Sequence, residues 1–286
     1  LLRLRDAEPS VRSTLVDLVD GFLDHVPESQ LRSLPVLDRL LHHLVRERRV
    51  DDLVEVGVFA ASVEIKNARV VRRGLAYYIS YPFFEATDPK KAVPREVYRL
   101  DDELKIRQKT EEVCWQDGRL HISGRIGIRH LRARKRWQQH LAAFAVNTDT
   151  GRRVRVPVRT RLAAEYRLPD VVDAARHDYG GFTVVLDPRK LRTANQWRPG
   201  EWKIELVVFN RGLTRRHNIS SPVPGPPERP PYRQVAENTW VRPYWTKDKQ
   251  FVIGVEPVRA RVTGHRFVPG SGELTLEGEV LSGPAV

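Results

Sequence analysis

Asp117-Gly118-Arg119-Leu120-His121-Ile122-Ser123-Gly124-Arg125-Ile126 is the stretch that decides the fold class, because its pattern occurs twice in the chain. Residues 271–280 read Ser-Gly-Glu-Leu-Thr-Leu-Glu-Gly-Glu-Val, with both glycines at the same spacing. Each copy combines a turn glycine with apolar residues at alternate positions, which is typical of a strand entered from a tight turn. We therefore predict two related β-domains, of which the second has barely begun at residue 286.

The first sixty residues have a helical pattern instead. Ser10 can cap a helix that must end before Pro27, and its apolar stripe consists of Val11, Leu15, Leu18 and Phe22. Ser33 and Pro35 mark the start of a second helix, whose stripe consists of Leu37, Leu40, Leu41 and Leu44. A short third helical segment covers residues 51–58. Because short helices are marginal alone, each stripe needs a neighbouring surface.

After about residue 59 the apolar period changes from 3.6 to 2. Alternating apolar positions recur at 120–122, 154–158, 182–186 and 202–208, with turn residues between them. Closely spaced strands with frequent turns favour an antiparallel sandwich over βαβ units. The sequence thus predicts a mainly β fold with an N-terminal helical segment: an antiparallel immunoglobulin-like β-sandwich followed by the start of a second β-domain. Residues 163–178 fit either a loop or a short helix.

Five segments follow from these patterns. We expect a helical linker segment at 1–60, a β-rich connector at 61–97, the sandwich at 98–220, a Pro-rich linker at 221–232 and a partial second β-domain at 233–286. Six prolines between residues 221 and 231 favour an extended, semi-rigid path.

The composition points to an anionic partner or to a biased genome. The formal net charge is +13, and lysine supplies only 10 of the 49 basic residues. Such a charge suits a phosphate-containing polymer, nucleic acid or an acidic membrane surface. A GC-rich genome, which favours arginine codons, gives the same excess of arginine over lysine.

The sequence also bears on location. No run of about 18 apolar residues predicts a transmembrane segment, and nothing near Leu1 resembles a signal peptide. The single Cys114 excludes an internal disulfide and fits a reducing compartment. We expect the chain to be cytoplasmic or peripheral at the inner face of the membrane. Since it lacks methionine and starts at Leu1, we also expect a preceding segment.

No catalytic constellation emerges from the residues. The chain has no phosphate-binding glycine loop and no nucleophile elbow, and Cys114 has the pattern of a small core residue in a strand. His42 and His43 point about 100° apart on a helix, which favours a solvated face over a metal site. Asp101-Asp102-Glu103 has the character of loop charge. We therefore predict no catalytic, cofactor-binding or metal-binding residue, and expect that this segment is not an enzyme.

Arginine clusters are the best candidates for binding. Arginines at alternate positions between 153 and 161 would place a row of guanidinium groups on one strand face, and further clusters lie at 129–136 and 211–217. Guanidinium groups suit bidentate contact with phosphate, whereas a solvated strand face needs no ligand. Specific nucleic-acid binding is disfavoured, because no aromatic residues interleave with the arginines. The candidate polymer-binding residues are Arg153, Arg155, Arg159, Arg161, Arg215 and Arg216.

Several short motifs resemble the region that follows the catalytic domain in bacterial family-2 glycosyltransferases of the wall-teichoic-acid type, especially actinobacterial ones. They span nearly the whole chain and comprise Leu34-Pro35-Val36-Leu37-Asp38-Arg39, Tyr81-Pro82-Phe83-Phe84-Glu85, Tyr98-Arg99-Leu100-Asp101-Asp102-Glu103-Leu104, Trp115-Gln116-Asp117-Gly118-Arg119-Leu120-His121-Ile122-Ser123-Gly124, Asp178-Tyr179-Gly180-Gly181-Phe182 and Pro199-Gly200-Glu201-Trp202.

The resemblance implies an accessory role beside catalysis. In that family a helical linker and immunoglobulin-like β-domains follow a transferase domain, and they serve oligomerisation and contact with an anionic acceptor polymer. The implied partners are a missing N-terminal transferase domain, a phosphate-containing cell-wall polymer and a second copy in a homo-oligomer. A related arrangement places such a region between a glycosyltransferase and a glycerophosphotransferase domain. A stand-alone carbohydrate- or protein-binding β-sandwich module is the alternative.

Overall fold

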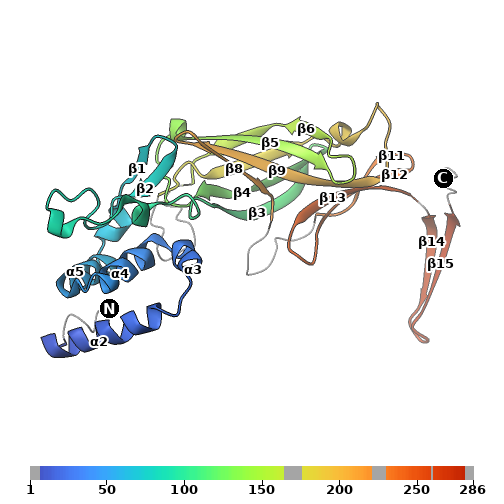
Figure 1. Ribbon diagram of the computed structural model, residues 1–286. Coiled ribbons are helices and arrows are strands. Elements are labelled where there is room, and N and C mark those ends of the chain that lie inside the picture. Colours follow the sequence, from blue (N-terminus) through green and yellow to red (C-terminus); the bar gives the residue numbers. More distant parts are fainter. Residues whose placement is uncertain (1–6, 164–175, 221–229, 259, 281–286) are drawn as a thin grey trace. The chain divides into compact units, whose positions relative to one another are not determined.

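The computed structural model describes residues 7–163, 176–220, 230–258 and 260–280, which form two compact units (Figure 1). The helical unit comprises Leu1–Arg107, Gly127–Arg134 and Glu165–His177, and the β unit comprises Gln108–Ile126, Lys135–Ala164 and Asp178–Val286. The predicted mainly β fold with N-terminal helices and antiparallel sheets is confirmed. Two predicted segments lie largely outside the described residues. One is the Pro-rich linker, and the other is the stretch 163–178, for which the sequence fits either a loop or a short helix.

The helical unit contains the three predicted helices, α2 (Pro9–Leu23), α4 (Val36–Arg46) and α5 (Val50–Ala61), and a short helix, α3 (Glu28–Ser33), that was not predicted. A hairpin of β1 (Val70–Arg73) and β2 (Ala76–Ile79) follows. Short 3-10 turns are η1 (Glu64–Asn67), η2 (Pro89–Lys91) and η3 (Arg95–Tyr98).

Helices α4 and α2 differ in how far their apolar stripes are buried. Helix α4 buries Leu40 and Leu44 completely, so its stripe lies in the core of the unit. Helix α2 buries only Val16 and Leu23, while Leu18 and Phe22 are 72% and 69% exposed. The predicted need for a neighbouring surface is therefore met for α4 and is not met for α2 within the described residues.

The β unit contains two larger antiparallel sheets. The four-stranded sheet has the order β3 (Ile106–Gln116), β4 (Arg119–Ile128), β8 (Gly181–Leu186) and β7 (Val158–Arg161). The seven-stranded sheet has the order β11 (Arg233–Ala236), β12 (Thr239–Trp245), β13 (Phe251–Pro257), β9 (Gly200–Asn210), β5 (Gln139–Asn147) and β6 (Arg153–Val156), and β10 (Leu213–Asn218) also pairs with β9. Two 3-10 turns, η4 (Arg136–Gln138) and η5 (Pro188–Leu191), lie in the connections.

Strand alternation produces the core of the β unit. On β9, Trp202, Ile204, Leu206 and Val208 are buried, while the residues between them face outward. Phe182, Val184 and Leu186 do the same on β8. Each sheet therefore has one apolar buried face and one outer face that carries the polar side chains.

The repeated glycine pattern marks two hairpins. Asp117 and Gly118 both have positive φ, 48° and 76°, which matches the two-residue turn that joins β3 to β4. Gly272 (φ 68°) likewise precedes β15 (Glu273–Val280), which pairs with β14 (Ala260–Val268). Gly124 has a further reason to be glycine, because a Cβ there would lie 2.2 Å from the carbonyl oxygen of Lys109.

The strands that follow residue 230 enter the large sheet. Strand β13 pairs with β9 through Val252–Val255, and β12 and β11 continue the sheet from there. Of the described strands after residue 230, β14 and β15 are the exception: they form a separate two-stranded sheet, and the described side chains of this hairpin are largely exposed.

Candidate functional site: the outer faces of the sheets and a pocket in the helical unit

The structure divides the predicted arginine row between two sheets. Strand β6 ends at Val156, Pro157 interrupts the pairing because it has no N–H, and β7 begins at Val158. Arg153 and Arg155 consequently belong to the seven-stranded sheet, and the arginines at 159 and 161 belong to the four-stranded sheet. The expectation of one continuous guanidinium row is wrong.

Arg215 and Arg216 are separated in the same way. Arg215 lies opposite the buried Val208, whereas Arg216 lies opposite Val207 on the outer face. Because adjacent residues of a strand point to opposite faces, only Arg216 joins the outer surface of the seven-stranded sheet. Arg215 is partly buried and hydrogen-bonds to the carbonyl oxygen of Thr214 at 3.3 Å.

One half of this outer face is basic. We call it the cationic half and define it by Arg153, Arg155, Lys203 and Arg216. The strand register places these side chains on one face. Phe144 on β5 lies opposite Arg155 on β6 on one side and opposite Glu205 on β9 on the other, so these positions face the same way. Four cationic side chains from three strands therefore share one surface.

Their partners differ. The Cζ atom of Arg153 lies 4.5 Å from the ring centroid of Phe144, and Arg153 also forms an ion pair with Glu205. Within the described part of the chain, Arg155 and Arg216 make no ion pair, and both are exposed. These two guanidinium groups therefore have donors free of any competing carboxylate.

The outer face of the four-stranded sheet is closer to neutral. Glu111 accepts hydrogen bonds from both Arg125, at 2.5 Å, and Arg161. Arg159 is exposed and has no ion pair among the described residues. Of the two candidate arginines on β7, only Arg159 is therefore available to a ligand among the described residues. The seven-stranded sheet has two such arginines, Arg155 and Arg216.

The opposite end of the seven-stranded sheet combines aromatic and charged side chains. We call it the aromatic half and define it by Tyr232, Trp240, Arg242, Tyr244, Glu201 and Glu256. The Cζ atom of Arg242 lies 4.5 Å from the ring centroid of Tyr244, and its Nη2 lies 2.6 Å from Glu256 Oε1. Tyr244 donates its hydroxyl hydrogen bond to Glu201. Burial, followed by this contact with Glu201, raises the pKa of Tyr244 to about 12. This group is absent from the residues predicted from the sequence, although the alternation Trp-x-Arg-x-Tyr was its signal.

The helical unit holds a pocket of about 910 Å³. Its lining contains four guanidinium groups, two imidazoles and four carboxylates, so its formal charges balance. The lining residues are Val26, Glu28, Leu31, Arg32, Arg39, His42, His43, Arg46, Glu96, Val97, Arg99, Asp101 and Asp102. His42 and His43 are thus half-buried pocket residues, and burial lowers the pKa of both.

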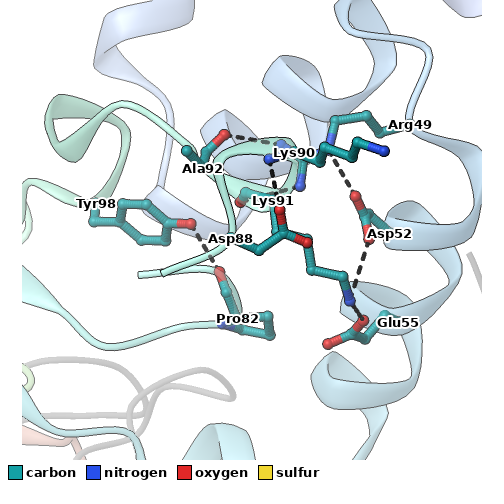
Figure 2. Close-up of polar contacts among 9 residues, drawn as sticks. All are labelled: Arg49, Asp52, Glu55, Pro82, Asp88, Lys90, Lys91, Ala92 and Tyr98. Carbon is teal, nitrogen blue, oxygen red and sulfur yellow. Dashed lines mark hydrogen bonds and ion pairs between the residues drawn. The ribbon is translucent and has the colours of Figure 1, made fainter. Parts of the chain in front are cut away.

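A polar network holds the loop around Lys91 and Ala92, which precedes the pocket residues Glu96 and Val97 in the chain (Figure 2). Arg49 donates hydrogen bonds to the carbonyl oxygens of Ala92, at 3.0 Å, and Lys91, at 3.1 Å. Its Nε lies 2.6 Å from Asp52, and Lys91 reaches Glu55 at 3.3 Å. Since the Arg49 and Asp52 side chains are only 14% and 15% exposed, this network holds the loop against α5 and serves structure.

Glu103 has a structural role that its sequence context concealed. Its carboxylate accepts a hydrogen bond from the backbone N–H of Val36, at 2.7 Å, at the first turn of α4. It also lies 3.2 Å from His130 Nε2 and 3.7 Å from Arg129. Burial raises the pKa of Glu103, but the hydrogen bonds from His130 and Val36 outweigh it, so the net shift is downward. The expectation of mere loop charge is wrong for this residue.

Nothing in the described residues forms a metal site of three or more His, Cys, Asp or Glu side chains. Burial, together with the charge of Glu112, raises the pKa of the partly buried Cys114 and keeps it as a thiol. Among the helices described, none combines the length and apolar character needed to cross a membrane.

Comparison with known proteins gives distant structural similarity without a match in sequence. No protein-family model matches the chain, and no curated protein matches it. Among solved structures, the chain is similar to the crystal structure of S. aureus TarS 217–571, with a TM-score of 0.48 and 10% sequence identity. The match covers 91% of this chain and 67% of that chain. At this TM-score the similarity carries no argument about residues or function.

Proposed function

We propose that this chain is a non-catalytic accessory region of a glycosyltransferase acting on cell-wall glycopolymers of the teichoic-acid type, and that its cationic half holds the anionic acceptor polymer. The observation that supports this most is the pair Arg155 and Arg216, which are exposed on one sheet face and have no ion pair among the described residues. The enzyme context rests on the sequence motifs that resemble the teichoic-acid-type family.

The spacing of the two arginines suits a polymer better than a single small anion. Arg155 on β6 and Arg216 on β10 are separated by β5 and β9, which corresponds to about 14 Å at the usual distance between strands. Arg153 and Lys203 are both in register with Val146 on β5, beside this path on the side away from Arg216, and they add positive charge there. A flexible phosphodiester chain can follow this surface with successive phosphates, each neutralised by one cation.

Titration with a defined poly(glycerol phosphate) or poly(ribitol phosphate) tests the proposal. We expect the double variant Arg155→Ala/Arg216→Ala to bind at least tenfold more weakly at about 50 mM salt, with a log–log salt slope smaller by roughly 1.4, because two phosphate contacts are lost. Arg119→Ala, which removes an exposed arginine of the other sheet, is the matched control and should bind like wild type. Equal affinity of the double variant and wild type would remove the basis of the proposal.

The exposed stripe of α2 supports a second part of the accessory role, packing against the transferase domain. Leu18 and Phe22 lie one turn apart, and both are more than two-thirds exposed. Such a contiguous apolar surface is typical of a contact site. Leu18→Ser/Phe22→Ser should abolish association with the separately produced transferase domain without lowering the melting temperature of this chain. Val58→Ser, at an exposed position of α5, is the control. Loss of self-association in sedimentation, with transferase binding intact, would instead identify the stripe as an oligomer contact.

A further inference from the structure

The aromatic half lacks the excess charge that would recruit a polyanion. Its charged members are Arg242, Glu201 and Glu256, so it carries no net positive charge. Its side chains nevertheless share one face, because Trp240, Arg242 and Tyr244 occupy alternate positions of β12 and the residues between them are buried. Aromatic side chains that stay on the outer face of a sheet, with the core already filled beneath them, are available for a ligand.

The polar groups of this surface are held in place by one another. Arg242 lies between two rings, with its Cζ 4.5 Å from the centroid of Tyr244 and 5.8 Å from that of Tyr232. Glu256 accepts from Arg242 and Glu201 accepts from Tyr244, so both carboxylates have fixed positions. A carboxylate has about four lone-pair sites, so each retains acceptor capacity after these contacts.

A glycine lets two side chains of the group lie close to the backbone of β13. Gly254 lies between Arg242 on β12 and Glu201 on β9 in the strand register. A Cβ at this position would lie 3.1 Å from Glu256 Oε1 and 3.7 Å from Tyr244 Cε1. Gly254 is itself buried, so the Glu256 carboxylate and the Tyr244 ring lie directly against the sheet.

We propose that the aromatic half binds a neutral sugar ring. A sugar has one apolar C–H face and a rim of hydroxyl groups, and this surface offers the matching parts. The rings of Tyr244 and Trp240, four residues apart on β12, suit the apolar faces of successive sugar rings, while Glu201 and Glu256 accept hydrogen bonds from hydroxyl groups. The inference goes beyond the proposed function, because it names another ligand class and other residues, and it stands whether or not the cationic half binds phosphate.

The test uses the full chain and a panel of neutral tetrasaccharides built from glucose, galactose or N-acetylglucosamine. We expect at least one of them to bind with a Kd in the range of about 0.1–1 mM by isothermal titration or NMR shift mapping. Raising the salt from about 50 to 200 mM should leave that Kd unchanged within twofold, because no phosphate is neutralised. No binding of any tetrasaccharide at about 10 mM overturns the inference.

Two variants locate the site and one controls for it. Tyr244→Ala should weaken binding at least tenfold, and Gly254→Val should do the same by displacing the Glu256 carboxylate and the Tyr244 ring. Valine suits a strand, so the second variant keeps the fold if the first loses it. Trp137→Ala removes another exposed aromatic side chain, from η4, and should leave the Kd unchanged. Binding that survives both site variants, or that is lost only in Trp137→Ala, contradicts the assignment. The poly(glycerol phosphate) titration is read separately, so failure of one proposal is distinguishable from failure of the other.

Discussion

The helical unit and the β unit use their charged residues in opposite ways. In the helical unit, Glu103 and the pair of Arg49 with Asp52 lie inside, and every one of them has a hydrogen-bond or ion-pair partner. In the β unit, Arg155 and Arg216 lie on an open sheet face without such a pair in the described residues. The same residue types thus stabilise the fold in one unit and are available to a ligand in the other.

Desolvation accounts for the difference. A buried charge requires a partner, because its lost hydration is otherwise uncompensated, and removing one partner leaves the other exposed to that penalty. An exposed guanidinium group keeps its hydration, so an ion pair there contributes little to stability. The comparison predicts that substitutions in the helical unit affect stability, whereas substitutions on the sheet face affect binding.

The largest expected effect follows from removing Glu103. Glu103→Ala takes away the acceptor of the Val36 N–H and the charge beside His130 and Arg129. We expect the free energy of unfolding to fall by about 3 kcal/mol, measured by urea denaturation. Glu273→Ala, on the exposed hairpin, should change it by less than about 0.5 kcal/mol. Equal stabilities of the two variants would contradict the distinction between buried and exposed charge.

The next effect is a pH dependence of stability. The folded-state pKa of Glu103 lies below its usual value, so the unfolded chain binds more protons. Its contribution is therefore complete above the ordinary glutamate pKa of about 4.3 and is lost as the pH falls through the lower folded-state value. We expect the loss of stability between neutral and acidic pH to be smaller in Glu103→Gln than in wild type, and a parallel pair of curves would argue against this role.

These residues also show what could be predicted from the sequence. Alternation of apolar residues predicted the buried faces of β8 and β9, and the glycine pattern predicted the tight turns before β4 and β15, because these signals are local. The backbone N–H that donates a hydrogen bond to Glu103 belongs to Val36, 67 positions away. The break at Pro157 places the arginines on β6 and those on β7 in different sheets. Long-range pairing and sheet assignment depend on tertiary contacts, so the predicted strand positions did not place the predicted site residues together.

A smaller effect separates the two outer faces. Arg155→Ala should weaken poly(glycerol phosphate) binding by about three- to fivefold at low salt, as expected for one lost phosphate contact. Arg159→Ala removes an equally exposed arginine from the four-stranded sheet and should leave the affinity within twofold of wild type. Both variants should unfold like wild type. A larger loss in Arg159→Ala would transfer the polymer path to the other sheet.

The smallest predicted effect has the opposite sign. Glu205 forms an ion pair with Arg153 in the middle of the cationic half, so it competes with phosphate for that guanidinium group. Glu205→Gln removes the competing charge, while the side chain keeps its length and Arg153 keeps its contact with the Phe144 ring. We expect the polymer to bind about two- to threefold more tightly, with a slightly steeper salt dependence, because one more cation contributes. In Arg153→Ala/Glu205→Gln this gain should disappear, since the released group is absent. A gain that persists in the double variant would mean that Glu205 acts through the general field of the face and not by occupying Arg153.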